Sequence, residues 1–364
     1  MKVTIIAGAR PNFMKIAPII HAIQQKQEED VDIRYRLVHT GQHYDKNLSD
    51  TFFEELNIPK PDANLNVKSG TQAEQTGAIM VGFEKELEQN PCDLVMVVGD
   101  VTSTMACTIV AKKAGVDVAH VEAGIRSGDM RMPEEINRIV TDSLTNYFFT
   151  TSEHANANLK DLGVDEKQVF FVGNVMIDTL LKNRPRFEQP EIFSELNLSP
   201  KQYFVMTLHR PSNVDEEMQL KVLITKIVEE SQGLPIIFPV HPRTKKLLEK
   251  LDISYENLYY VEPLGYLKFN YLVENALGVL TDSGGITEET TVMNVPCITL
   301  RENTERPETC EIGTNELVGS DFDKLSAAMS KIVSGEWKEG RIPELWDGQA
   351  APRIIECLVE LYDL

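Results

Sequence analysis

The stretch VTIIAGARP, at residues 3–11, has a counterpart of similar pattern much later in the chain, FVMTLHRP at residues 204–211. Each stretch is a short run rich in β-branched and apolar residues that ends in a cation and a proline. A run of this kind predicts a buried strand followed by a turn. Because the chain opens in this way twice, the sequence predicts two domains of one kind.

Both halves continue with short strand-like runs that alternate with longer helical patterns, for example at 14–27 and 73–88. In the first half the runs lie at 3–7, 35–39, 94–98, 116–121, 147–151 and 169–172. In the second half they lie at 203–208, 236–240, 258–261, 277–280 and 297–300. Residues 184–201, which contain three prolines among polar residues, are interpreted as a connector. This alternation predicts two doubly wound, Rossmann-like α/β domains with parallel sheets, facing each other across a cleft.

Composition excludes several classes of protein. The chain has 364 residues, with 36 Lys and Arg against 56 Asp and Glu, giving a net charge of −20. A field of that sign disfavours nucleic acid and anionic membranes. No apolar run approaches the about 20 residues that span a bilayer, and the N-terminal run is too short for a signal peptide. The sequence therefore predicts a cytoplasmic protein with neither nucleic-acid binding nor membrane insertion.

Five cysteines occur at wide spacing, and no two of them form a CxxC pair. An odd, widely spaced set suits a reducing compartment better than a disulfide framework. The same spacing argues against a zinc site, so no metal ligands are predicted.

The first candidate site is the turn from Gly8 to Lys15, where a strand gives way to a helix. A helix N-terminus attracts anions, and Arg10 and Lys15 add full positive charges. The turn lacks GxGxxG, so the dinucleotide fingerprint is absent. Phosphate binding and an ordinary turn with solvated cations both remain open from these residues alone.

The second candidate is TDSGGITEE, at residues 281–289, where a strand runs into two glycines and a helix. Gly284 and Gly285 would let the backbone approach a diphosphate, and Ser283 could donate a hydrogen bond or cap the helix. Glu289 lies about one turn inside the helix, within reach of a ribose diol. A capped helix with a solvated acidic turn is the plainer alternative.

Ionisable residues form a third candidate. Asp100, Glu122 and His209 each follow a predicted strand, and Glu134 and Arg138 sit at the start of a predicted helix. Ligands of doubly wound sheets bind beyond the carboxyl ends of the strands, so these side chains are expected at the ligand-binding ends of the sheets. Carboxylates together with a histidine are what proton transfer requires.

Taken together, these motifs resemble the non-hydrolysing UDP-N-acetylglucosamine 2-epimerases over nearly the whole length. The matching motifs, in family order, are GARPNFMK, HTGQH, GDVTST, HVEAGIRSG, MPEEINR, GNVMIDTL, TLHRP, PVHPR, LTDSGGITEE, RENTERPE and DGQAAPRI. The resemblance implies a fold like that of the two-domain UDP-sugar glycosyltransferases (the GT-B type). It also implies a last helix, near 350–362, that returns to the first domain. The expected domains are thus 1–173 plus 350–364, and 174–349.

The resemblance also implies roles for particular residues. The family's catalytic positions are matched by Asp100, Glu122, Glu134 and His209. Positions near the phosphates and the sugar are matched by Arg10, Lys15 and Arg138. Diphosphate and ribose contacts are matched by Ser283, Gly284, Gly285 and Glu289, and an aromatic at the uracil by Phe269. The family uses no added cofactor and proceeds by loss and re-addition of UDP through 2-acetamidoglucal. It also implies a homodimer.

Some relatives are activated by a second UDP-N-acetylglucosamine molecule. Their allosteric contacts are matched here by Gln42, His43, Arg210 and His241. Asp45 and the Ser69-Gly70 pair depart from that pattern, and so does the Pro-Ser-Asn run after Arg210, which leaves the activation open.

Four alternative functions also stay open. HTGQH and RMPEEINR resemble relatives that act on diacetamido-uronic UDP-sugars, and hydrolysing epimerases share DSGG-type motifs. A UDP-sugar glycosyltransferase and a nucleotide-sugar sensor without catalysis are the remaining alternatives.

Overall fold

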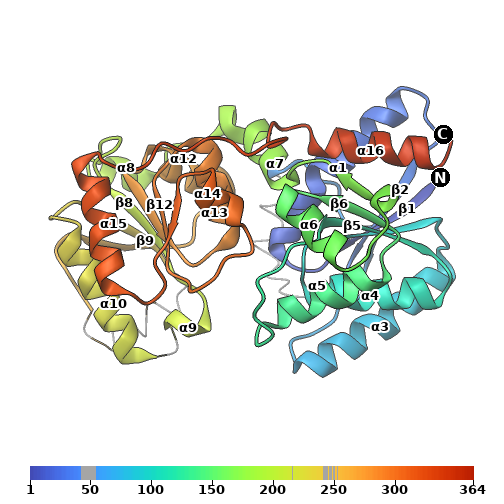
Figure 1. The fold of residues 1–364 in the computed structure, drawn as a ribbon, viewed down its shortest axis with the longest axis horizontal. Helices are drawn as coiled ribbons and strands as arrows, with labels where there is room; N and C mark the ends of the chain where they lie inside the picture. The colour runs from blue at the N-terminus through green and yellow to red at the C-terminus, as the bar shows by residue number, and fades with distance from the viewer. Residues whose placement is uncertain (42–54, 215, 241–244, 246–247, 249–250, 252) are drawn as a thin grey trace. The chain divides into compact units, whose positions relative to one another are not determined.

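A computed structural model describes residues 1–41, 55–214, 216–240, 245, 248, 251 and 253–364 (Figure 1). The chain divides into two compact units. The first comprises Met1–Lys182 with Glu344–Leu364, and the second comprises Asn183–Pro343. The sequence predicted boundaries at 173/174 and 349/350. In the structure, most of helix α7 (Val175–Asn183) and the segment from Glu344 to the last helix belong to the first unit instead.

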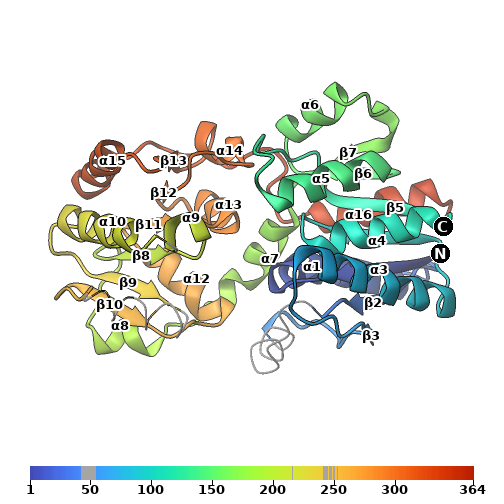
Figure 2. The same cartoon turned by 90° about the horizontal axis from the view of Figure 1, so that it is seen from below.

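In the described part of the first unit, seven parallel strands form one sheet in the order β3-β2-β1-β4-β5-β6-β7. Figure 2 shows this order running upward from β3 to β7. The strands are β1 (Lys2–Ala7), β2 (Arg34–His39), β3 (Ala63–Asn64), β4 (Leu94–Val98), β5 (Asp117–Ala123), β6 (Tyr147–Thr150) and β7 (Val169–Phe171). All of β4 is buried, as expected for a central strand covered on both faces.

Helices cover both faces of this sheet. They are α1 (Arg10–Glu28), α3 (Gln72–Gln89), α4 (Thr102–Lys113), α5 (Pro133–Leu144), α6 (Glu153–Asp161), α7 and α16 (Ala350–Leu361). The short 3₁₀ turn η1 (Glu166–Gln168) precedes β7, and a second one, η2 (Arg184–Arg186), follows α7 at the start of the second unit. α3, α4 and α5 pack together, as do α1 and α16, and Figure 1 shows these groups on opposite faces.

One long helix carries an internal proline. Pro18 has no N–H to offer the carbonyl of Met14, four residues earlier in α1. The Thr179 hydroxyl on α7 donates to that carbonyl instead, at 2.6 Å. A side chain far along the sequence thus satisfies the acceptor that the proline leaves, and α1 continues without interruption.

The second unit repeats the design. Its described residues form a six-stranded parallel sheet in the order β10-β9-β8-β11-β12-β13 (Figure 2). The strands are β8 (Phe204–Thr207), β9 (Ile236–Pro239), β10 (Leu258–Val261), β11 (Gly278–Thr281), β12 (Cys297–Thr299) and β13 (Asn315–Leu317). The helices are α8 (Glu191–Glu195), α9 (Pro211–Val214), α10 (Glu217–Glu230), α12 (Tyr266–Asn275), α13 (Gly284–Met293), α14 (Pro307–Glu311) and α15 (Phe322–Ser334).

The predicted α/β class with two doubly wound domains is confirmed. In each sheet the strand order reverses at one point, between β1 and β4 and between β8 and β11. Such a switch point opens a crevice at the carboxyl ends of the strands, where ligands of doubly wound sheets bind. No helix in the described ranges is both long and apolar enough to cross a bilayer.

Candidate functional site

The turn after β1 is built around Asn12. Its side-chain oxygen accepts hydrogen bonds from the N–H groups of Gly8 and Ala9, and its amide donates to the carbonyl of Val98 at the end of β4. Gly8 is needed for space, because a Cβ there would lie 2.3 Å from the Ser103 hydroxyl. The start of α1 is thereby tied to the switch point between β1 and β4.

Lys15 and Glu122 form an ion pair at this point. Lys15 is one turn into α1, while Glu122 is the penultimate residue of β5 and is 7% exposed. Gly99 lies against both, because a Cβ on Gly99 would be 2.8 Å from the Lys15 ammonium and 3.3 Å from the Glu122 carboxylate. Of the predicted phosphate ligands, Arg10 is the first residue of α1, but its side chain is outside the described part of the structure.

Glu122 does not follow its strand, as the sequence suggested, but lies within it. The register of β5 against β6 shifts between Val121 and Ala123, and Glu122 has a φ of 74°. A non-glycine residue in the left-handed region costs about 1–3 kcal/mol and persists only where its surroundings hold it. Bulges of this kind re-aim a side chain, and this one turns Glu122 toward Lys15.

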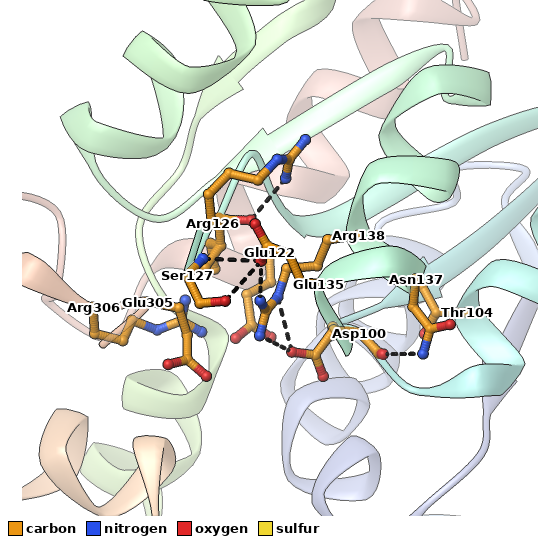
Figure 3. A network of polar contacts seen from close by, with 12 residues as sticks. Asp100, Thr104, Glu122, Arg126, Ser127, Glu135, Asn137, Arg138, Glu305 and Arg306 are labelled. Carbon is orange, nitrogen blue, oxygen red and sulfur yellow. Dashed lines mark hydrogen bonds and ion pairs between the residues drawn. The ribbon is translucent and has the colours of Figure 1, made fainter. Parts of the chain in front are cut away.

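Asp100 and Arg138 form a second ion pair at the end of the neighbouring strand β4 (Figure 3). The guanidinium of Arg138 donates to Asp100 through Nη2 at 2.7 Å and Nε at 3.1 Å. It also donates to Glu135 at 2.6 Å. Asn137 donates to the backbone carbonyl of Asp100 at 2.8 Å. Arg138 is buried, whereas the side chain of Asp100 stays 31% exposed, so this carboxylate can meet a ligand.

Glu134 and Glu135 differ sharply in environment. Glu135 is buried and accepts hydrogen bonds from the N–H groups of Ser127 and Gly128. Burial opposes its ionisation, but these donors and Arg138 together lower its pKa. Glu135 is therefore not a solvated carboxylate of the first helical turn but the residue that anchors Arg138. Glu134 is half-buried in the first turn of α5.

In the second unit, His209 follows β8 and its Nδ1 lies 2.7 Å from Asp282 at the end of β11. Asp282 is fully buried and also accepts from the N–H groups of His209 and Arg210. Burial works against its charge, but His209 and the other donors hold its pKa below the usual range. The imidazole of His209 is 62% exposed, so Asp282 fixes a ring that remains open to a ligand.

Helix α13 begins at Gly284, with Ser283 at the N-cap position and Gly285 as its second residue. The Ser283 side chain makes no capping hydrogen bond, so the capping role considered from sequence is not its role here. Arg301 lies close by, with Nη1 3.8 Å from the point that a Cβ on Gly284 would occupy. That nitrogen is buried and has no hydrogen-bond partner among the described residues. The other end of the guanidinium is paired with Glu305 at 2.6 Å, so the helix start and the remaining Nη1 donor are what this turn offers to an anion.

Glu289 is buried in α13 and accepts a hydrogen bond from the Tyr266 hydroxyl at 2.7 Å. Burial raises the pKa of Glu289 to about 7, and the Tyr266 bond partly offsets that rise. Phe269, one turn along α12 from Tyr266, is half-buried.

Of the predicted allosteric contacts, Gln42, His43 and His241 lie outside the described residues, as does Asp45. Arg210 is described. Its Nε donates to the carbonyl of Asp282 at 3.1 Å, and its Nη2 lies 3.7 Å from Glu305.

Sequence reasoning missed four residues that hold the candidate ones in place: Asn12, Glu135, Asp282 and Arg301. Each lies inside a quoted motif, so composition and order were visible. What was missing was the partner, since Asp282 meets His209 across many residues of chain. An acidic residue just after an apolar run was the signal that the sequence offered for Asp282.

Polar groups gathered at the switch points of two doubly wound sheets define a two-domain α/β protein of the GT-B-like class. Residues 25–359 match the family model described as UDP-N-acetylglucosamine 2-epimerase. The chain belongs to the UDP-N-acetylglucosamine 2-epimerase family.

Individual relatives match over their full length. The UDP-N-acetylglucosamine 2-epimerase of Methanocaldococcus jannaschii is 43% identical over 98% of this chain and 99% of its own. Its crystal structure in complex with UDP-GlcNAc and UDP matches with a TM-score of 0.87, covering 99% of this chain and 100% of that one. The UDP-2,3-diacetamido-2,3-dideoxy-D-glucuronate 2-epimerase of Pseudomonas aeruginosa is 37% identical over 99% of this chain and 100% of its own.

Proposed function

We propose that the protein interconverts UDP-N-acetylglucosamine and UDP-N-acetylmannosamine by inverting C2, without hydrolysis and without an added cofactor. The observation that carries this proposal is that two carboxylates at the ends of adjacent strands, Asp100 and Glu122, are each paired with a cation. Such pairs are suited to proton transfer at a charged substrate. Family membership and the ligands named for the Methanocaldococcus structure support the choice of substrate.

The chemistry follows from the acidity of the sugar. No carbonyl stands beside C2, so its proton is not acidic in the intact substrate. If the C1–O bond breaks and UDP takes the electron pair, positive charge develops at C1 and C2–H becomes acidic. A carboxylate then removes the C2 proton, which leaves 2-acetamidoglucal and UDP.

The return step reverses each event. A carboxyl group delivers a proton to the opposite face of C2, and a phosphate oxygen of UDP re-forms the bond to C1. Either Asp100 or Glu122 can take either role, with Glu134 as a further candidate. Exchange with solvent then resets both groups.

We assign the leaving group to the second unit. The start of α13, with Gly284, Gly285 and the unused donor of Arg301, offers positive potential to a diphosphate. We assign His209, whose ring is oriented by Asp282, to the departing phosphate. Glu289 and Phe269 are assigned to the ribose and the uracil, and Lys15, Arg10 and Arg138 to the phosphates and sugar.

A second substrate class is supported by the Pseudomonas relative, which is named as a diacetamido-glucuronate 2-epimerase. The ring substituents at C3 and C5 distinguish the two candidates.

We also propose the cytoplasm as the location, because the five cysteines are all free. We propose a homodimer on the strength of family resemblance alone.

The test is NMR of the reaction in heavy water, with each UDP-sugar in turn and no NAD. We expect one deuterium at C2 of the product from UDP-N-acetylglucosamine. Glu122→Gln and Asp100→Asn should lower turnover by about 10²–10⁴-fold and leave UDP affinity intact. Free N-acetylmannosamine would indicate a hydrolysing enzyme. Turnover of the diacetamido-uronate UDP-sugar alone would indicate the second substrate class. Tight binding of UDP-sugar without turnover would indicate a sensor. Retention of the C2 proton would refute the elimination route.

A further inference from the structure

Behind the two carboxylates lies a buried polar group that the proposed chemistry does not use. His120, on β5 two residues before Glu122, is completely buried. Its Nδ1 lies 2.7 Å from Asp142 on α5, and its Nε2 lies 2.8 Å from the carbonyl oxygen of Gly99. Because a carbonyl oxygen only accepts, Nε2 is the donor in the second bond.

Gly99 is the residue directly before Asp100, and both sides of its backbone are held by β5. Its N–H donates to the carbonyl of Val121, and its carbonyl accepts from His120. The φ of Gly99 is 65°, in the left-handed region, so this peptide is not held by a continuing strand. The bond from His120 therefore fixes the direction in which the chain leaves β4 and presents Asp100.

The other partner of His120 reaches the other carboxylate. Asp142 accepts from the N–H of Gly124, which follows the bulge at Glu122, and pairs with Arg126 at 2.7 Å. Burial opposes the charge of Asp142, while His120 and Arg126 favour it, with the net effect of a lowered pKa. One buried pair thus braces the backbone at the ends of the neighbouring strands β4 and β5, beside Asp100 and beside Glu122.

We infer that His120, backed by Asp142, is a positioning residue that sets the separation of Asp100 and Glu122 for proton transfer at C2. The inference rests on the proposed function. It assigns no contact with the substrate to His120, which is fully buried. Displacement of a reacting group by about 1 Å can lower a rate by about 10²-fold, so a modest shift of Asp100 suffices.

The two ring nitrogens allow a sharp test. A glutamine amide reaches about as far as Nε2 and can still donate to the Gly99 carbonyl, while an asparagine amide reaches only to the position of Nδ1 and keeps the Asp142 contact. We expect His120→Gln to retain kcat within about tenfold and His120→Asn to lose about 10²-fold, with KM and UDP affinity little changed in both. Loss of deuterium exchange at C2 should follow kcat.

The exposed His154 on α6 gives the control, since the same two exchanges there should leave kcat unchanged. Melting temperatures separate positioning from folding. Activities of the His120 variants that merely follow their stabilities, or full kcat in His120→Asn, would overturn the inference. If His120→Asn does not fold, His120→Ser replaces it, because a serine hydroxyl is too short to bridge both partners. An inactive wild type would instead defeat the proposed function.

Discussion

Phe269 is half-buried on α12, whereas Tyr266 and Leu267 on the same helix are buried. An aromatic ring left partly open beside the Glu289 helix suits a flat base. We expect Phe269→Ala to weaken UDP binding by about 0.5–3 kcal/mol through lost stacking and burial. Calorimetry with UDP measures this, and Phe322→Ala, at an exposed aromatic of the same unit, is the control. Normal UDP affinity with a lowered melting temperature would make Phe269 a packing residue only.

Glu289 gives the stability of the protein a pH dependence. Its pKa in the fold is about 7, above the ordinary value of 4.5, chiefly because of burial. The folded chain therefore holds this proton more tightly than the unfolded chain. The resulting stabilisation is complete below pH 4.5 and is lost as the pH rises through about 7.

Glu289→Gln should remove this dependence, which is on the order of 3 kcal/mol. In urea unfolding, the free energy of unfolding of the variant minus that of wild type should rise from pH 5 to pH 8. The same difference for Glu256→Gln, an exposed site in the same unit, should stay flat. A flat difference for Glu289→Gln as well would show that the carboxyl titrates normally.

At the scale of elements, Pro18 in α1 and Thr179 in α7 are expected to be energetically coupled. Thr179→Val removes the donor to the Met14 carbonyl and should cost about 1–3 kcal/mol of stability, the penalty of an unmet buried acceptor. Thr179→Ser should cost less, since the hydroxyl remains.

Pro18→Ala supplies the missing N–H within the helix. In that background Thr179→Val should cost clearly less than in wild type. A double-mutant cycle by denaturant unfolding measures the difference. Equal costs in both backgrounds would mean that the hydroxyl does not replace the lost helical bond.

The sequence predicted elements better than it predicted contacts. The run at 94–98 coincides with β4, because an uninterrupted apolar stretch has few alternatives in a parallel sheet. The predicted strand at 116–121 stops before Glu122, whereas β5 continues to Ala123. A charged residue with a left-handed backbone inside a strand is not expected from local sequence pattern. The connector at 184–201 also hides a short helix, α8, whose Phe193 is buried.

Candidate side chains were predictable where they follow strands, as Asp100 and His209 do, since topology alone gives them a common address. Their partners were not. Arg138 and Asp142 both lie on α5, from which they reach Asp100 and His120. Such pairs depend on how helices pack on the sheet, which local periodicity does not encode.

At the scale of the molecule, the first unit is discontinuous in sequence. Segment 344–364 completes it, with Trp346 buried and donating to the Thr151 carbonyl, and with Ile354, Ile355 and Leu358 fully buried on α16. Each such apolar side chain contributes about 1.5–3 kcal/mol, against about 5–15 kcal/mol for a whole domain.

We therefore expect fragment 183–343 to unfold cooperatively by itself, and fragment 1–182 to do so only when the peptide 344–364 is added. Near-ultraviolet circular dichroism with thermal melting measures both. Cooperative melting of 1–182 alone, at the midpoint seen with the peptide, would show that the returning segment is dispensable for the fold.

The bulge at Glu122 has a consequence for any selection applied to this protein. Aspartate enters the left-handed region more readily than glutamate, so the backbone at this position would relax with Asp in place of Glu. The same exchange draws the carboxylate back by one methylene from the position at which we propose proton transfer. Selection for heat tolerance and selection for turnover would therefore favour different residues at position 122.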